Sequence, residues 1–355
     1  MFENVNNHFV DVSEKAGIYG SVIGFGLGVT VSDLNNDGWE DIYVSNDFFE
    51  RDYLYINQQN GTFKEKLTGA INSISGASMG ADAADINNDG YSDIFVTEML
   101  PDEYERLKTV TTFEDWNKYQ YNLKNDYYHQ FTRNMLQLNN SNETFSEVGR
   151  FSGVEASDWS WGALFFDMNN DGAKDLFIAN GIYKDLTNQD YLHYVSNEEV
   201  LHSMVTGNKV DYKKLIDIIP SNKVKNHAYI NKGNLAFKRE NNGLNTEGFS
   251  NGAAYGDLDN DGDLDLVVNN VNMPLFVYKN NVDPTKSNYV KLILHGEGAN
   301  TNAIGAKLKL TTTSGNYYLE QQPVRGFQSS MDNRPNFGFK ENDSISLTVT
   351  WPSGK

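Results

Sequence analysis

The sequence predicts an all-β protein, a β-propeller of four-stranded blades with aspartate-rich hairpin loops, two partly helical insertions and a small C-terminal β domain. Three observations predict this fold. A nine-residue aspartate-rich motif recurs four times, each copy is followed by a short run of strand-forming residues, and glycine and tyrosine are abundant while long apolar runs are absent. Regularly spaced short strands with turn signals are typical of repeated all-β architectures.

The motif carries side-chain oxygens at positions 1, 3, 5 and 9 and glycine at position 6, and its copies begin at Asp33, Asp85, Asp167 and Asp257. A second pattern lies between the copies, in which a strand ends in asparagine and phenylalanine follows six residues later, as at Asn57 and Phe63. Together these signals predict units of strand, loop, strand, turn, strand, turn, strand. Such four-stranded blades cannot bury their faces alone and must stack on neighbours.

The distance from the first aspartate to the asparagine is 24 residues in the first unit, 54 in the second and 64 in the third. The excess predicts insertions at about residues 101–130 and 183–225. The first insertion is rich in aromatic residues, which either bind a partner or pack the insertion onto the propeller: Tyr104, Phe113, Trp116, Tyr119, Tyr121, Tyr127 and Tyr128. We expect the propeller to span residues 1–281 and the C-terminal domain residues 286–355.

The chemistry of the loops favours Ca²⁺, which takes six to eight oxygen ligands in flexible geometry. Positions 1, 3, 5 and 9 supply side-chain oxygens, and position 7 can supply a backbone carbonyl. An EF-hand would need a glutamate at position 12 and flanking helices, whereas position 12 here is Val44, Val96, Ile178 or Val268 and the flanks are strands. A metal-free turn and a magnesium site are the alternatives. We expect about four calcium ions, with these ligand positions: Asp33, Asn35, Asp37, Trp39, Asp41, Asp85, Asn87, Asp89, Tyr91, Asp93, Asp167, Asn169, Asp171, Ala173, Asp175, Asp257, Asp259, Asp261, Asp263 and Asp265.

These repeats resemble the FG-GAP/VCBS repeats, the calcium-bracing units of integrin-type propellers, over residues 9–281. The C-terminal segment, with Arg325-Gly326-Phe327, Asn336-Phe337-Gly338 and Trp351-Pro352-Ser353-Gly354, resembles the ASPIC/UnbV domain of cartilage acidic protein-like and bacterial surface proteins. The resemblance implies more blades than four. Residues 9–12 therefore either end a blade whose beginning is absent, or complete the blade that ends at residues 275–278 and close the ring.

Composition and sequence patterns argue against several classes of function. The net charge of −19 argues against nucleic acid, since a phosphate backbone needs a basic surface. There is no membrane-spanning apolar run, no cysteine, and no visible signal peptide. Gly76-Ala77-Ser78-Met79-Gly80 fits a nucleophile-elbow pattern, but a strand follows where that motif needs a helix.

We therefore expect a non-enzymatic, calcium-stabilised extracellular, cell-surface or periplasmic binding or adhesion module that recognises a glycan or protein. The loops join the first two strands of each unit and the insertions follow the second strand, so the insertions should emerge at the opposite end, which we call the insertion face. The alternative is a surface glycan-active lyase or hydrolase that uses acidic residues on this face. The repeat position thirteen residues after each first aspartate gives a candidate ligand-binding ring on that face, or a set of strand caps: Asn46, Glu98, Asn180 and Asn270.

Overall fold

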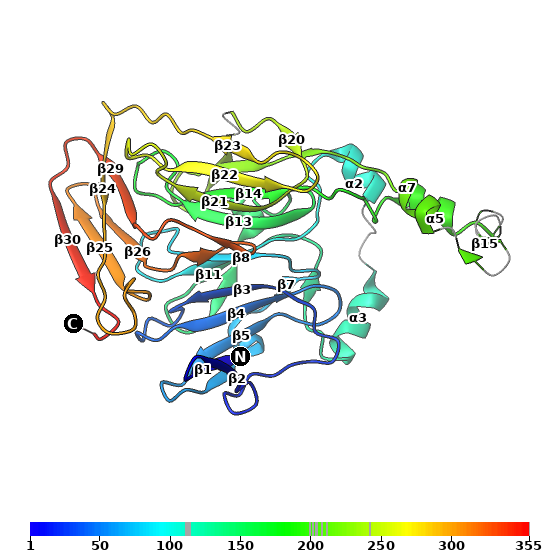
Figure 1. Ribbon diagram of the computed structural model, residues 1–355, viewed down its shortest axis with the longest axis horizontal. Helices are drawn as coiled ribbons and strands as arrows, with labels where there is room; N and C mark the ends of the chain where they lie inside the picture. The colour runs from blue at the N-terminus through cyan, green and yellow to red at the C-terminus, as the bar shows by residue number, and fades with distance from the viewer. Residues whose placement is uncertain are drawn as a thin grey trace.

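The protein is all-β, with a few short helices. The computed structural model describes residues 1–110, 115–198, 200, 202, 205–206, 209–210, 212–240 and 243–354. Phe113 of the sequence analysis lies outside these residues. Figure 1 shows three zones along the long axis of the molecule: the C-terminal strands at the left, a stack of sheets in the middle, and the helical insertions at the right.

The stack contains four antiparallel sheets, one for each aspartate-rich motif, and the motif always links the first two strands. The first three sheets have four strands each, which pair in chain order. They comprise β3 (Gly26–Ser32), β4 (Asp41–Asn46), β5 (Tyr53–Asn57) and β6 (Phe63–Glu65); β8 (Ala81–Ala84), β9 (Asp93–Val96), β11 (Met135–Asn139) and β12 (Phe145–Glu147); and β13 (Ser160–Phe166), β14 (Asp175–Asn180), β18 (His227–Asn231) and β19 (Phe237–Arg239).

The fourth sheet has three strands, β21 (Ser250–Gly256), β22 (Asp265–Asn270) and β23 (Phe276–Tyr278), so the expectation of four strands in every sheet is wrong here. After β23 the chain turns back to the fourth loop, where the Val282 amide donates to Asp263 Oδ2 at 2.8 Å. Residues 279–286 then lead into the C-terminal strands without forming a fourth strand of this sheet.

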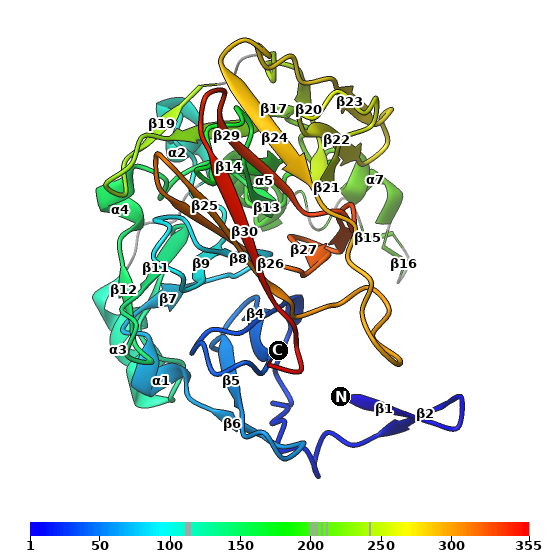
Figure 2. The ribbon, with the colours of Figure 1, turned by 90° about the vertical axis from the view of Figure 1, so that its left-hand side faces the viewer.

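The sheets follow one another around an arc, with their first strands side by side (Figure 2). β3 packs beside β8, β8 beside β13, and β13 beside β21. A separate apolar cluster fills each gap between successive sheets, built around Tyr43 in the first gap, Phe165 in the second and Phe177 in the third. Within the described residues no strand pairing joins the first sheet to the fourth.

The N-terminal strands form a hairpin of their own. β1 (Phe2–Val5) pairs with β2 (His8–Asp11), and both strands are exposed, with Phe2 at 65% and Phe9 at 76%. β2 does not pair with β23 in the described structure, so the ring-closure alternative is not found. The backbone of β2 instead forms its antiparallel hydrogen bonds with β1, from which it is separated by a two-residue turn.

The insertions leave the sheets at the end opposite the loops. Between β9 and β11 lie α2 (Tyr104–Val110), α3 (Trp116–Lys124) and β10 (Gln130–Phe131), which pairs in parallel with β7 (Ile74–Ser75). Between β14 and β18 lie α5 (Gln189–Val195), α7 (Tyr212–Asp217) and the pair β15 (Val205–Thr206) and β16 (Lys209–Val210). The remaining short elements are α1 (Leu67–Ala70), α4 (Gly149–Ser152), β17 (Val224–Lys225) and β20 (Glu247–Gly248). Among the described helices none has the length and apolarity needed to cross a bilayer.

The C-terminal strands have their own core, which includes Leu308, Leu310 and Phe337. β24 (Ser287–Lys291) pairs with β29 (Asn336–Lys340), and β25 (Lys307–Thr312) pairs with both β26 (Asn316–Glu320) and β30 (Ile345–Thr350). The hairpin β27 (Val324–Arg325) and β28 (Ser329–Ser330) leaves this unit and reaches the first strands of the stack. We call residues 287–350 the C-terminal unit; it lies at the loop end of the sheets (Figures 1 and 2).

Candidate metal centres

The four motif loops adopt one backbone conformation. Position 4 is left-handed in every loop, with φ of 62° at Asn36, 58° at Asn88, 55° at Asn170 and 62° at Asn260. Position 6 is left-handed as well, with φ between 87° at Gly38 and 96° at Gly262. Asparagine and glycine tolerate this region best, which explains their place in the motif. The two left-handed residues fold the loop back on itself so that its oxygen-bearing side chains turn inward.

The carboxylate at position 1 organises each loop. In the first loop, Asp33 Oδ1 accepts the Asp37 amide at 3.0 Å and Asp33 Oδ2 accepts the Gly38 amide at 2.6 Å. The same two bonds recur at Asp85, Asp167 and Asp257. Position 5 then accepts the position 7 amide, for example Asp37 Oδ1 from Trp39 at 2.9 Å. These repeated bonds hold the loop in shape and bring positions 1, 3 and 5 close together.

The carboxylate at position 9 ties the loop to its sheet. Asp41 accepts the Leu34 amide with Oδ2 at 3.0 Å and the Asn57 amide with Oδ1 at 2.8 Å. Equivalent bonds join Asp93 to Asn139, Asp175 to Asn231 and Asp265 to Asn280. The sequence pattern marked the first three of these asparagines without assigning them a role, and it missed Asn280, which lies two residues after β23.

Three of these asparagines, Asn139, Asn231 and Asn280, also join neighbouring sheets. The Asn139 amide nitrogen Nδ2 donates to the Leu34 carbonyl in the preceding loop at 2.8 Å. Asn231 does the same to Ile86 at 2.8 Å, and Asn280 to Met168 at 2.7 Å. The carbonyl at position 2 of one loop is therefore bonded by the next sheet along the chain. We call this contact the asparagine joint.

The loops concentrate negative charge where water is scarce. Burial, together with neighbouring loop carboxylates, raises the pKa of Asp41 to about 7 and those of Asp93 and Asp175 to about 8. Burial likewise raises the pKa values of Asp85 and Asp167 to about 6. Clustered carboxylates disfavour one another's ionised form unless a cation neutralises them. The electrostatics of the loops therefore favour a bound cation.

The fourth loop has the most complete set of acidic ligands. One carboxylate oxygen from each of Asp257, Asp259 and Asp265 lies within 4.8 Å of the others. Asp263 is buried and its Oδ1 has no hydrogen-bond donor. Burial and the neighbouring Asp261 raise the Asp263 pKa to about 6. Three converging carboxylates are the arrangement that a hard cation would complete.

Comparison with known proteins gives the family. The FG-GAP-like repeat model matches residues 2–96 and 213–268, and the ASPIC and UnbV model matches residues 296–355. The chain is an FG-GAP-like repeat protein with a C-terminal ASPIC and UnbV domain. This confirms the resemblance found in the sequence.

Individual relatives match parts of the chain. Integrin alpha-3 of Mus musculus is 36% identical over 100 residues, 24% of this chain and 9% of the integrin. Integrin alpha-6 of Homo sapiens is 41% identical over 83 residues, 20% of this chain and 7% of the integrin. Cartilage acidic protein 1 of Homo sapiens is 22% identical over 259 residues, 62% of this chain and 37% of that protein. The chain therefore spans a small part of the integrins it matches and about a third of cartilage acidic protein 1.

One solved structure aligns over most of the chain but only loosely. It is an Agrocybe aegerita lectin that recognises non-reducing terminal N-acetylglucosamine, with 12% identity, 96% of this chain and 88% of the lectin covered, and a TM-score of 0.28. At that score the likeness supports no conclusion about fold or ligand.

The FG-GAP-like loops fit a calcium ion in their donor chemistry. Hard oxygen donors at positions 1, 3, 5 and 9 are the ligands that Ca²⁺ prefers. The structure places position 3 next to position 5 in the first three loops, where Asn35 Nδ2 donates to Asp37 Oδ2 at 3.1 Å and the later loops repeat the contact. The backbone carbonyls of Trp39, Tyr91, Ala173 and Asp263 at position 7 remain predicted ligands.

The candidate ring on the insertion face is built differently. Asn46, Glu98, Asn180 and Asn270 are all buried, at 7% exposure or less. Asn46 Nδ2 donates to the Arg51 carbonyl at 2.9 Å, and Asn180 Nδ2 to the Lys225 carbonyl at 2.9 Å. Asn270 Nδ2 donates to the Pro274 carbonyl at 2.8 Å. These asparagines close the strand ends and hold the connecting chain, which favours the strand-cap interpretation.

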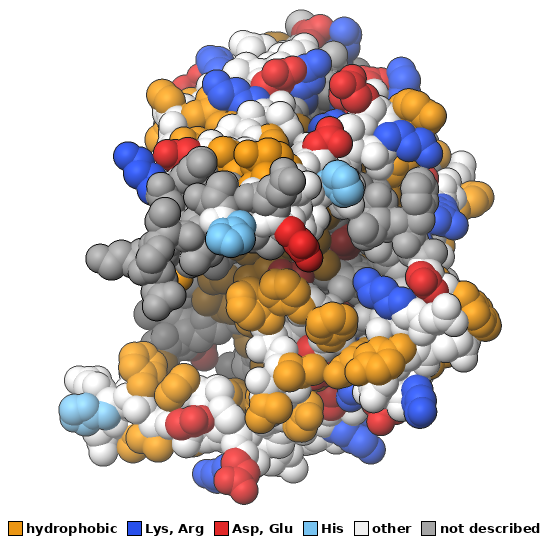
Figure 3. All heavy atoms as spheres, turned by 90° about the vertical axis from the view of Figure 1, so that its right-hand side faces the viewer, with side chains coloured by type: hydrophobic (Ala, Val, Ile, Leu, Met, Phe, Trp, Pro, Cys, Tyr) orange, Lys and Arg blue, Asp and Glu red, His pale blue; other side chains and the backbone are white. Residues whose placement is uncertain are grey.

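The aromatic residues of the first insertion divide into two groups. Tyr119 and Tyr128 hold the insertion in place: the Tyr128 hydroxyl donates to the Ile71 carbonyl outside it at 2.7 Å, and the Tyr119 hydroxyl lies 2.6 Å from His129 Nδ1 within it. Tyr104, Trp116 and Tyr121 are between 57% and 76% exposed. Figure 3 looks onto this end of the molecule, where apolar side chains gather between charged ones. The exposed group is available to a partner.

Ser78 is a structural residue. Its hydroxyl donates to Asp52 Oδ2 at 2.8 Å, and the Tyr43 hydroxyl donates to the same oxygen at 2.6 Å. All three side chains are buried, and the segment leads into the strand β8. The nucleophile-elbow pattern therefore has no matching geometry.

Proposed function

We propose that this chain is a non-enzymatic extracellular or cell-surface binding module, a β-propeller whose FG-GAP-like loops each hold a structural calcium ion. The observation that carries the proposal is the repetition of one loop, with the same left-handed residues and the same carboxylate–amide bonds, in all four sheets. Integrins, which the chain resembles in part, are adhesion proteins, and this supports a binding role.

Calcium supplies positive charge between carboxylates that would otherwise repel one another. In each loop the position 1 and position 9 carboxylates already brace the backbone, so an ion bound to them ties both ends of the loop together. The role of the metal is then to stiffen the sheet end.

Two lysines offer a competing way to neutralise the fourth loop. Lys279 contacts Asp259 and lies 3.4 Å from Asp261, and Lys291 contacts Asp257. The Lys279 side chain is 57% exposed, so it is free to swing out when a cation arrives. The first three loops show no equivalent of Lys279 in the described hydrogen bonds of their positions 3 and 5. Lysine alone therefore does not account for the conserved loop shape across the four sheets.

Calcium removal tests the proposal. Melting in calcium and in excess EDTA should differ by about 10 °C or more, since four filled sites add several kcal/mol to the free energy of unfolding. Asp259→Ala removes an exposed ligand and should lower the calcium stoichiometry measured by titration calorimetry. Asp190→Ala, at an exposed aspartate of α5, is the matched control. An unchanged melting temperature after complete metal removal would refute the calcium role.

The partner is proposed to be a glycan or a protein that meets the insertion end, where Tyr104, Trp116 and Tyr121 are exposed. Exposed aromatic side chains on loops are common in recognition surfaces. Binding on a glycan array or to extracellular matrix proteins without turnover supports the module. Release of products from a polysaccharide would instead support a glycan-active enzyme.

A further inference from the structure

The loop end is covered by the C-terminal unit. Tyrosine rings of this unit lie against the position 6 glycines of three loops: Tyr318 at Gly90, Tyr317 at Gly172 and Tyr289 at Gly262. A Cβ atom at Gly172 or Gly262 would collide with the ring. The glycine of the motif thus permits the turn and also receives a tyrosine.

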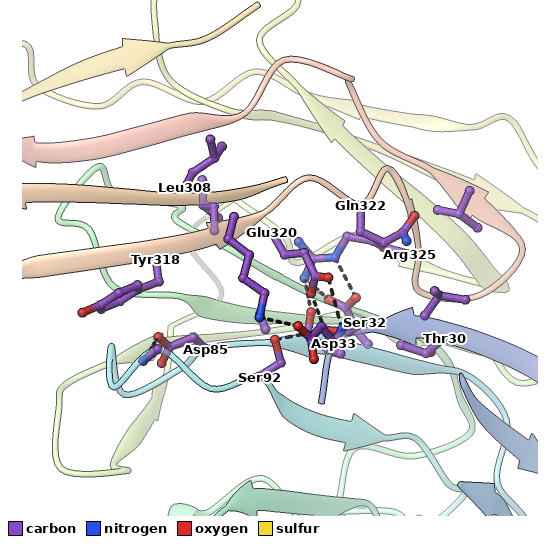
Figure 4. A pocket seen from close by; sticks show the side chains of 18 residues that line it. Thr30, Ser32, Asp33, Asp85, Ser92, Leu308, Tyr318, Glu320, Gln322 and Arg325 are labelled. Carbon is purple, nitrogen blue, oxygen red and sulfur yellow. Dashed lines mark hydrogen bonds and ion pairs between the residues drawn. The ribbon is translucent and has the colours of Figure 1, made fainter. Parts of the chain in front are cut away.

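Charged side chains of the C-terminal unit reach the loops directly. Lys307 Nζ lies 2.5 Å from Asp33 Oδ2, and Lys291 contacts Asp257 Oδ2. Glu320 accepts the Asp33 amide at 3.1 Å and the Ser32 hydroxyl at 2.5 Å (Figure 4). The first residue of the motif is therefore held by the C-terminal unit in the first and fourth loops.

The two oxygens of these position 1 carboxylates have different neighbours. Lysine contacts Oδ2 in Asp33 and in Asp257, on the side where the position 6 amide also donates. Oδ1 faces the loop interior and accepts the position 5 amide. One carboxylate can thus serve a cation inside the loop and a lysine of the C-terminal unit outside it.

A second anchor does not involve the loops. Arg325 of β27 forms a buried pair with Asp82 of β8, with Nε to Oδ1 at 2.8 Å and Nη2 to Oδ2 at 2.6 Å. Its Nη1 donates to the Tyr255 hydroxyl at 2.9 Å. Phe327 lies against Gly80 and Gly162 at the first strands of the second and third sheets. The C-terminal unit therefore has a fixed anchor in the arc and a rim of contacts on the loops.

The rim is sensitive to loop charge. Glu320 brings a negative charge to a loop that already contains Asp33, Asp37 and Asp41, with Glu40 beside them. Repulsion between Glu320 and the loop carboxylates weakens docking of the C-terminal unit when the loop holds no cation. A divalent ion in the loop turns that repulsion into attraction.

We propose that cation binding by the loops and docking of the C-terminal unit are thermodynamically linked, with Tyr289, Tyr317 and Tyr318 as positioning residues that raise the calcium affinity of the loops they touch. The inference rests on the proposed calcium role. Because linkage is reciprocal, calcium tightens the docking by the same factor as docking tightens calcium binding.

Two measurements on the full chain test the linkage. In hydrogen–deuterium exchange, calcium should slow exchange in peptides from β24 to β26 as well as in the loops. In titration calorimetry with calcium, Tyr289→Ala should weaken binding at the fourth loop about fivefold or more, whereas Lys291→Met removes a competing cation from Asp257 and should not weaken it. Tyr289→Phe keeps the ring over Gly262 and should bind as the parent does, and Lys340→Met removes an exposed lysine of the same unit without touching a loop.

The outcomes separate the two proposals. If the chain binds no calcium, the proposed function fails. If it binds calcium but exchange in β24 to β26 is unchanged, or if Tyr289→Ala binds calcium as Tyr289→Phe does, the linkage is wrong while the calcium role stands. Tyr289 is 39% exposed, so its replacement leaves the core of the C-terminal unit intact.

Discussion

The two ends of the sheets are built in different ways. At the loop end, four copies of one motif form four copies of one structure, and the C-terminal unit contacts all of them. At the insertion end, asparagines recur at the strand ends, but connections of different length are otherwise held by unrepeated contacts such as Arg106 with Asp158 and Asp185. The comparison shows how a repeat protein combines a regular end with an irregular one, and the proposed recognition role falls to the irregular end.

The largest effect should come from the anchor of the C-terminal unit. Arg325→Met leaves Asp82, which is fully buried, without its cationic partner, and should lower the free energy of unfolding by about 3–5 kcal/mol. Urea unfolding measures the loss. Adding Asp82→Asn removes the unpaired buried charge and should recover part of the lost free energy of unfolding. A loss below about 1 kcal/mol in the single variant would mean that the pair does not anchor the unit.

A smaller loss is expected at the insertion end. Arg106 donates to Asp158 at 2.8 and 2.9 Å and to Asp185 at 2.5 Å, and the Asp185 side chain is fully buried. Arg106→Met should cost about 2–4 kcal/mol by urea unfolding. The loss should be the same in calcium and in EDTA, because this contact is remote from the loops. Arg150→Met, at an exposed helix residue, is the control, and a calcium-dependent loss at Arg106 would contradict the separation of the two ends.

The smallest of the three effects is a pH dependence, also at the insertion side. Burial, with the Arg239 guanidinium beside the ring, lowers the pKa of His227 to about 4. Below pH ~6.5 the unfolded chain binds a proton at this histidine while the folded chain does not, so stability falls as the pH is lowered toward 4. The contribution is about 2 kcal/mol between pH 6.5 and 5. Urea unfolding at pH 6.5 and at pH 5 measures this contribution, and His227→Gln should reduce the difference in the free energy of unfolding between the two pH values. An equal pH dependence in both proteins would show that His227 is not buried in its neutral form.

Local repetition made the loops predictable from sequence. Asparagine at position 4 and glycine at position 6 encode left-handed backbone, and four copies distinguished a motif from an accidental turn. The family also followed from residues alone. The all-β class is confirmed, whereas the closed propeller and the calcium ions stay proposals.

The contacts between residues far apart in the sequence could not be predicted. Arg325-Gly326-Phe327 contributed to a family resemblance, but nothing near it in sequence points to Asp82, 243 residues away. The same is true of Glu320 and Asp33, which are separated by 287 residues. The sequence analysis placed the candidate ligand-binding ring on the insertion face and did not predict that the C-terminal unit covers the loops. Such pairings depend on how the arc brings its first strands together, which no local pattern encodes.

The asparagine joint gives the molecule an order of assembly. The Leu34 carbonyl in the first loop has to wait for Asn139, that of Ile86 for Asn231 and that of Met168 for Asn280. Each of these three loops is therefore completed only when the sheet that follows it in the chain has formed. The order of the sheets along the chain thus sets the order in which these loops can be completed.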